Sequence, residues 1–67
     1  MAIGKITVRA ATLEEAYDQY VAEARKMLGG RPFWTTGIDA VAVTSLYEPG
    51  VTHGWDVTYG FSWGGEL

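Results

Sequence analysis

The chain has 67 residues with 48% hydrophobic content, a net charge of −3, no cysteine and one histidine. This composition excludes disulfides and thiolate zinc sites, and a lone histidine cannot build a histidine-rich metal site. The acidic balance argues against non-specific binding to nucleic acid and against docking on anionic membranes. No apolar run approaches ~18 residues, the length of a membrane span. We therefore expect one small domain, residues 1–67, in the cytoplasm.

Size alone favours self-association. A domain of this length buries only about 60% of the surface that its unfolded chain exposes, so its stability is marginal unless something adds to it. Disulfides, a structural metal or association with other chains are the usual additions, and the composition leaves association. We expect a homo-oligomer.

The first half of the chain predicts a strand followed by a helix. Alternation of apolar and polar residues indicates a strand from about Ala2 to Ala10. Thr12 and Glu15 have the spacing of a capping box, and Gly29 follows the last apolar residue, so the helix is expected from Leu13 to Leu28. The predicted apolar stripe of this helix consists of Leu13, Ala16, Tyr17, Tyr20, Val21, Ala24, Met27 and Leu28.

A second strand is expected from Ile38 to Tyr47, which leaves Phe33 and Trp34 in a connector. Neither face of this strand is strongly polar, which indicates burial on both sides or at an interface. Residues 48–51, Glu-Pro-Gly-Val, are typical of a type II turn. The last two strands are therefore expected to form an antiparallel hairpin.

The most regular segment of the sequence runs from Trp55 to Trp63. Aromatic and apolar residues alternate there with small polar ones, and Gly60 in the middle indicates a bulge, a bend or a close approach. The aromatic face is either the core or a platform for a flat ligand. We expect Tyr59 and Phe61 to pack on the helix, whereas the two terminal tryptophans are better placed to reach an interface.

These elements predict an α+β fold, a single β-α-β-β domain with a three-stranded antiparallel sheet packed on one helix. Asp39 and Asp56 are expected to pair with Arg9 or Lys5 on the polar sheet face. The sequence contains no paired-carboxylate, Ser-His-Asp or phosphate-loop signature. We therefore expect a protein that is not an enzyme and that holds no metal.

The order of elements, the strand KITVRA, the helix opening TLEEAYDQY and the terminal strand WDVTYGF resemble those of dodecins. Dodecins are small flavin-binding proteins that assemble as hollow dodecamers, with a curved sheet wrapped around the helix. The resemblance implies that Trp34 lies close to the place of the tryptophan that stacks on the flavin, one residue away. One departure is that the flavin-contacting glutamine of the family would fall near Gly54, which has no side chain.

Five residues are candidates for ligand binding. The leading one is Trp34, because an indole can stack on a flat heterocycle and it follows Arg31 in a predicted loop. Trp55 and Trp63 end the aromatic strand, and the single histidine of the chain, His53, precedes it. The implied ligands are FMN, FAD or riboflavin, or another nucleotide-like ring.

Two functions from different classes remain open. The first is a homo-oligomeric protein that stores or sequesters an aromatic small molecule between tryptophans at subunit contacts. The second is a small protein-interaction module, such as a phage or mobile-element inhibitor of a host protein or an assembly component, because aromatic residues also anchor interfaces.

Overall fold

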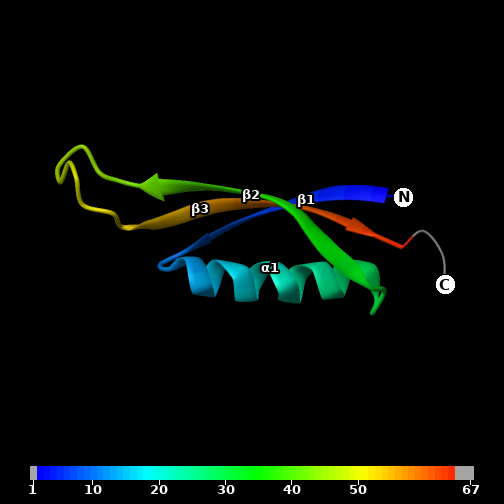
Figure 1. The fold of residues 1–67 in the computed structure, drawn as a ribbon. Coiled ribbons are helices and arrows are strands. Elements are labelled where there is room, and N and C mark those ends of the chain that lie inside the picture. Colours follow the sequence, from blue (N-terminus) through cyan, green and yellow to red (C-terminus); the bar gives the residue numbers. More distant parts are fainter. Residues whose placement is uncertain (1, 65–67) are drawn as a thin grey trace.

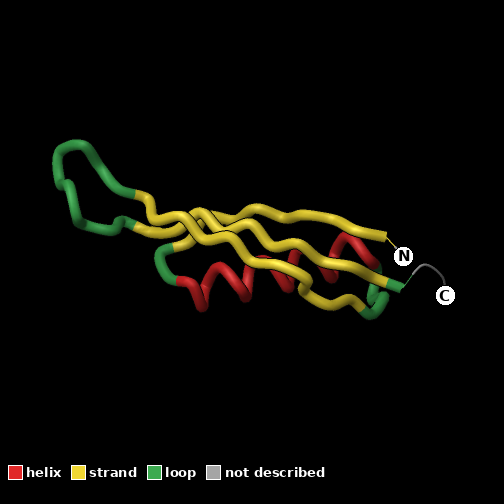
Figure 2. Tube along the Cα trace, turned by 45° about the horizontal axis from the view of Figure 1, so that its top comes forward, coloured by secondary structure: helices red, strands yellow, loops and turns green. Residues whose placement is uncertain are grey.

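The computed structural model describes residues 2–64 and has an α+β fold of two layers (Figure 1). In this part of the chain the order is β1 (Ala2–Ala10), α1 (Leu13–Leu28), β2 (Phe33–Val43) and β3 (Gly54–Trp63). The strands form one antiparallel sheet in the order β1-β3-β2, and α1 lies against one face of it (Figure 2). The predicted fold class is confirmed. The ends of the expected domain 1–67 lie outside the described residues.

Local capping signals set the ends of α1 where the sequence predicts them. Thr12 Oγ1 accepts a hydrogen bond of 3.1 Å from the Glu15 backbone N–H, and thereby satisfies a donor of the first turn. At the other end Gly29 adopts a left-handed conformation with φ 61°, and its N–H donates to the Arg25 carbonyl. The helix begins and ends where expected because both capping residues form hydrogen bonds with backbone groups of the adjacent turn.

The aromatic strand is central in the sheet, which is why its apolar face forms the core. Val57, Tyr59 and Phe61 of β3 are buried against α1. The Tyr20 ring of α1 stacks on Tyr59 at 4.2 Å between centroids, and its hydroxyl is hydrogen-bonded to Thr35 Oγ1 at 2.9 Å. The prediction that the middle of this strand packs on the helix is confirmed.

The bounds predicted for the second strand, Ile38–Tyr47, are wrong: β2 begins five residues earlier and ends at Val43. Phe33 and Trp34 are therefore strand residues and not part of a connector. The Phe33 ring packs edge-on against Tyr20 and Phe61. This packing draws residues 33–37, which precede the predicted start of the strand, into the sheet. A tight turn ends the strand, since the Tyr47 N–H donates to Ser45 Oγ.

The predicted turn that follows is confirmed. The Val51 N–H donates to the Glu48 carbonyl at 3.2 Å, and Gly50 has φ 86°, as the third position of a type II turn requires. This turn forms the tip of a hairpin that projects beyond the helix (Figure 1). The side chains of Leu46 and Tyr47 at the tip are almost fully exposed.

Of the two alternatives expected for β2, burial on both sides is wrong within one chain, because the interior of this strand is exposed from Trp34 to Ala42. Burial at an interface stays a prediction. The reason is the position of α1, which packs on β1 and β3 and leaves the second half of β2 without a helix above it. For the same reason the apolar stripe of α1 is only partly covered. Ala16, Tyr20, Ala24 and Leu28 are buried, whereas Leu13, Tyr17 and Met27 are exposed.

Candidate functional site

The sheet face turned away from α1, here called the open face, carries the small polar side of the aromatic strand. In the strand register, residues opposite one another share a face, so each β3 residue on this side has a neighbour on β1 and on β2. From one end of the molecule to the other, the rows across β1, β3 and β2 are Ile3–Ser62–Trp34, Lys5–Gly60–Gly37, Thr7–Thr58–Asp39 and Arg9–Asp56–Val41.

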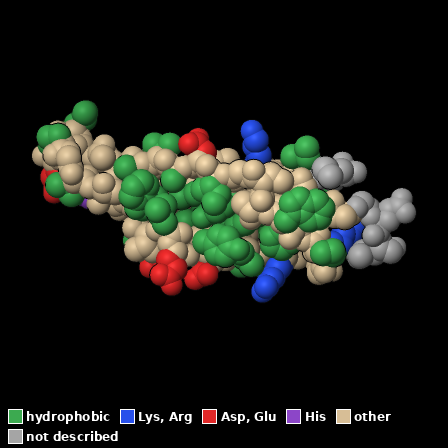
Figure 3. All heavy atoms as spheres, in the orientation of Figure 1, with side chains coloured by type: hydrophobic (Ala, Val, Ile, Leu, Met, Phe, Trp, Pro, Cys, Tyr) green, Lys and Arg blue, Asp and Glu red, His purple; other side chains and the backbone are tan. Residues whose placement is uncertain are grey.

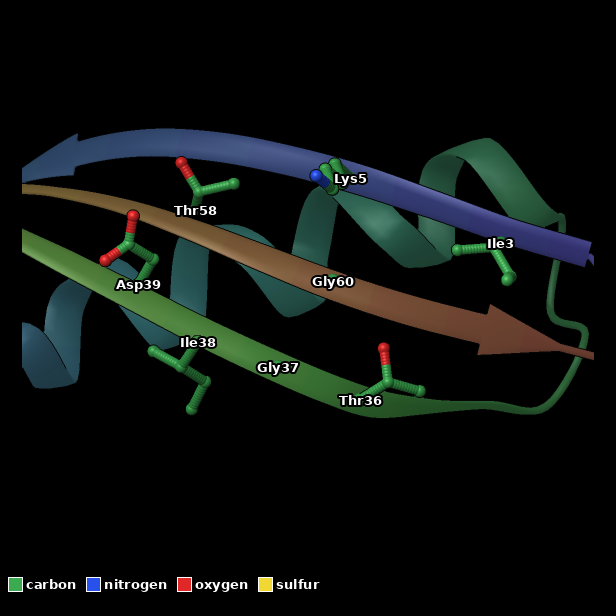
Figure 4. A pocket seen from close by; sticks show the side chains of 8 residues that line it. All are labelled: Ile3, Lys5, Thr36, Gly37, Ile38, Asp39, Thr58 and Gly60. Carbon is green, nitrogen blue, oxygen red and sulfur yellow. The ribbon is translucent and has the colours of Figure 1, made fainter.

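A hollow of about 410 Å³ lies on the open face, and its floor is made of backbone (Figure 4). Gly60 and Gly37 are register partners at its centre, so neither strand raises a side chain there. A β-bulge between Thr35 and Gly37 interrupts the register beside this pair and adds Thr36 to β2. Of the three features that Gly60 was expected to indicate, a bulge, a bend or a close approach, a bulge lies beside it, but on the neighbouring strand.

Hydrogen-bonding groups from all three strands surround this floor. Lys5 of β1, Thr58 of β3, and Thr36 and Asp39 of β2 line the hollow, together with the apolar residues Ile3 and Ile38. The Thr58 hydroxyl is already hydrogen-bonded to Thr7 Oγ1 at 2.9 Å. Cationic, anionic and hydroxyl groups therefore converge on a space wide enough for a small planar molecule.

The predicted ion pairing on the polar face is confirmed for one of the two aspartates. Arg9 Nε and Nη2 donate to the two carboxylate oxygens of Asp56 at 2.7 and 2.8 Å, a bidentate pair beside the hollow. Hydrogen bonding and charge from Arg9 lower the pKa of Asp56, and the same contacts raise the pKa of Arg9. Lys5 and Asp39 both line the hollow, and no ion pair joins these two described side chains.

Trp34 lies on the open face, in the row next to the glycine floor. Its side chain is opposite Ser62 and 47% of the residue is exposed. Ser62 is buried although it points to the open face. Its neighbours there are Ile3 on β1 and Trp34 on β2. Trp34 does not itself line the hollow, but about half of its surface is exposed in the adjacent row, where an indole is free to stack on a planar molecule.

The other two tryptophans are on the opposite face of the sheet. Trp55 and Trp63 share the helix-facing side of β3, are partly buried, and pack against the core. Trp63 contacts Phe61 with ring centroids 5.4 Å apart. Trp63 lies eight positions after Trp55 along the strand, or roughly 27 Å at 3.3–3.4 Å per residue. One chain therefore does not bring its three indoles together.

Arg31 and His53 lie at opposite ends of a molecule that is 50 Å long. Arg31 is exposed in the turn after α1, where its N–H donates to the Leu28 carbonyl, at the same end as Trp34. His53 is in the connection between β2 and β3, and its Nε2 lies 3.8 Å from a carboxylate oxygen of Glu48. Of the five predicted residues, the structure places Trp34 and Arg31 at one end and His53 at the other.

The residues that line the hollow were not predicted as a site. The sequence offered two signals, the mid-strand Gly60 and the small residues that alternate with the aromatic ones. Lys5, Thr36 and Asp39 join them only through the strand order and the bulge, which place β1 and β2 on either side of β3. The turn pattern predicts that β2 pairs with β3, but no local pattern shows that β1 pairs with the other side of β3.

No protein-family model, characterised protein or solved structure matches this chain. The resemblance to dodecins therefore stays a prediction. Within residues 2–64, no helix is both long and apolar enough to cross a membrane. Over the same residues, no three histidine, cysteine, aspartate or glutamate side chains are grouped so that they could hold a metal ion.

Proposed function

We propose that this chain is a cytoplasmic, non-enzymatic, homo-oligomeric binding protein that stores or sequesters a flat aromatic molecule, a flavin or a nucleotide-like ring. The observation that carries the proposal is the half-exposed indole of Trp34 in the row next to a glycine-floored hollow. The indole supplies a stacking surface, and the hollow supplies hydrogen-bonding groups for the edge of a ring.

A ligand held between two indoles needs more than one copy of the chain. Trp34 is on the open face, whereas Trp55 and Trp63 are on the helix-facing side, so no pair of these rings in one chain encloses a common space over the open face. A second Trp34, from a neighbouring copy, supplies the missing ring. This requirement is why the proposal couples binding to oligomerisation.

Calorimetric titration with FMN, FAD, riboflavin and AMP tests the proposal. Stacking of a base-like ring on an aromatic side chain contributes about 1–3 kcal/mol, so Trp34→Ala should weaken binding by about 5- to 150-fold. Trp34→Phe keeps a smaller ring, so its ligand affinity should lie between those of the wild type and Trp34→Ala. Trp55→Phe, on the other face, is the matched control and should bind as the wild type does.

A second substitution tests the hollow separately from the indole. Gly60→Val places its branched side chain above the backbone floor, where the nearest atom to the new Cβ is Thr36 Oγ1 at 3.2 Å. It should abolish binding while circular dichroism and unfolding remain close to those of the wild type. The absence of heat and of fluorescence quenching with every ligand, with Trp34→Ala behaving like the wild type, would refute the proposal.

The tip of the hairpin favours the second candidate, a protein-interaction module such as an inhibitor or an assembly component. Leu46 and Tyr47 are 98% and 95% exposed there, on a turn ordered by its own hydrogen bonds. Tyrosine is one of the residue types most often found as an anchor at interfaces. A host protein that is recovered in stoichiometric amount by the wild type, and not by a Leu46→Ser, Tyr47→Ser double variant, would support this function.

A further inference from the structure

The monomer exposes more surface than a chain of its length should. Its radius of gyration is 14.0 Å, compared with about 11 Å for a compact domain of 67 residues. Its accessible surface is 4727 Å², compared with about 4,200 Å² for a typical monomer of this mass. The excess, about 500 Å², is a large part of the ~800 Å² that each partner of a stable dimer buries.

The exposed apolar surface is concentrated along one side of the molecule. Tyr17 of α1 contacts the Tyr59 ring at 6.1 Å between centroids, and the β2 partner of Tyr59 on the same face is Ile38, which is 64% exposed. Ala40 and Ala42 continue this line and are also exposed. We call Tyr17, Ile38, Ala40 and Ala42 the uncovered apolar surface. Hydrophobic side chains gather on this side, between the sheet and the helix (Figure 3).

β2 is also an edge strand, so its outer backbone groups have no strand partner within the described chain. Natural edge strands usually carry lysine or other charged residues that prevent pairing with a further strand. The other edge, β1, has Lys5 and Arg9, whereas the regular part of β2 after the bulge, Gly37–Val43, has a single charge at Asp39. Of the two edge strands, β2 therefore carries the more apolar edge.

We propose that a second copy of this chain covers this surface by antiparallel pairing of β2 with β2 about a two-fold axis at Ala40. The bulge fixes the register, because Gly37–Val43 is the longest stretch of β2 without an irregularity and Ala40 is its midpoint. In this register Ile38 lies opposite Ala42 of the second copy. Asp39 lies opposite Val41, which avoids two carboxylates side by side.

The pairing produces a continuous sheet of order β1-β3-β2-β2-β3-β1, with both helices on the same face. The two uncovered apolar surfaces then adjoin at the centre and cover one another. The same register places Trp34 of one copy level with the hairpin tip of the other, whose Leu46 and Tyr47 are exposed in the monomer. The inference goes beyond the proposed function, because this register keeps the two Trp34 residues about twelve strand positions, or roughly 40 Å, apart and so does not itself bring the two indoles together.

A single engineered cysteine tests the contact directly, because the natural chain has none. Across an antiparallel pair the Cα atoms are about 4.5–5.5 Å apart, within the range that a disulfide spans. Mild oxidation of Ala40→Cys should therefore give covalent dimers in high yield. Ala22→Cys, exposed on the outer side of α1, is the matched control and should stay monomeric on a denaturing gel.

Charge substitutions test the same axis in solution. Ala40→Lys places two ammonium groups beside each other at the axis and should weaken self-association at least about tenfold in sedimentation velocity. An equimolar mixture of Ala40→Lys and Ala40→Glu should recover the wild-type mass, whereas Ala22→Lys should not change it. A monomeric wild type at about 100 μM, or Ala40→Cys cross-linking no faster than Ala22→Cys, would overturn the pairing.

These measurements need no ligand, so they separate the two proposals. A dimer cross-linked through Ala40→Cys that binds none of the aromatic ligands would leave the contact standing and remove the proposed function. Conversely, binding that depends on Trp34 in a protein that does not cross-link at Ala40→Cys would retain the function and remove this contact.

Discussion

Two glycines that are neighbours in the sheet should respond to the same substitution with opposite signs. Gly4 of β1 lies opposite Phe61 and faces the core. A Cβ atom built on Gly4 would lie 2.8 Å from Phe61 Cζ and 3.1 Å from Trp63 Cζ3, well inside the 3.5–4.0 Å of a normal carbon contact. The Phe61 ring cannot move away, because Tyr20, Phe33 and Trp63 surround it.

The magnitude follows from two opposing terms. Overpacking of a filled core costs about 1–3 kcal/mol, and replacing glycine by alanine within a strand recovers about 0.5–1 kcal/mol. Taking the middle of each range, about 2 and about 0.75 kcal/mol, Gly4→Ala should lower the free energy of unfolding by about 1.25 kcal/mol. At about 4–8 °C for each kcal/mol in a domain of this size, Tm should fall by about 5–10 °C.

Gly60→Ala is the matched control. The new Cβ would approach only Thr36 Oγ1, at 3.2 Å, and the exposed threonine side chain can rotate. The gain from replacing glycine by alanine within a strand then outweighs the close contact, and the free energy of unfolding should rise by about 0.5–1 kcal/mol. Urea unfolding followed by circular dichroism, with all variants at one protein concentration, measures both changes. A Gly4→Ala variant as stable as the wild type, or a Gly60→Ala variant destabilised to the same extent, would refute the packing argument.

Three further predictions concern stability. Gly54→Ala should lower the free energy of unfolding, by about 1–3 kcal/mol, in the same urea assay, because Gly54 has φ 154° and its Cβ would lie 2.9 Å from the Ala10 carbonyl oxygen. Arg9 lowers the pKa of Asp56 below its ordinary 3.8, so the ion pair stabilises the fold above that pH, and this contribution is lost as the pH falls. Asp56→Asn should therefore flatten the acid side of a plot of urea midpoint against pH. An unchanged slope would contradict this. Burial raises the pKa of Tyr59 above 10.0, so the phenol stays protonated in the folded state at a pH where it ionises in the unfolded state. Stability should therefore fall as the pH rises past 10. A Tyr59→Phe variant whose stability falls with the same alkaline slope as that of the wild type would be evidence against this.

The elements that agree with the sequence are those governed by nearby residues. The bounds of α1 follow from the Thr12 cap and from Gly29, and both act on backbone groups within one turn. β1 shows a simple alternation over its whole length. The middle of the aromatic strand is buried, as its pattern of side chains predicts.

β2 shows where local information is insufficient. Its first residues, Phe33 and Trp34, follow a proline and look like part of a loop. Phe33 nevertheless packs on Tyr20 and Phe61, which are 13 and 28 residues away, and this contact begins the strand. Its predicted end at Tyr47 failed for a similar reason, since the Ser45 side chain organises a turn that the apolar alternation conceals.

The sequence by itself determined the fold class, the ends of the helix and the aromatic composition of the core, because periodicity and capping are properties of neighbouring residues. Only the tertiary structure decided that β3 lies between β1 and β2, and this order produces every feature used for function. It places Lys5, Gly60 and Asp39 around one hollow and separates Trp34 from Trp55 and Trp63. It also leaves β2 at an edge that α1 is too narrow to cover, since one helix spans about 10 Å and covers only about two strands spaced 4.8 Å apart.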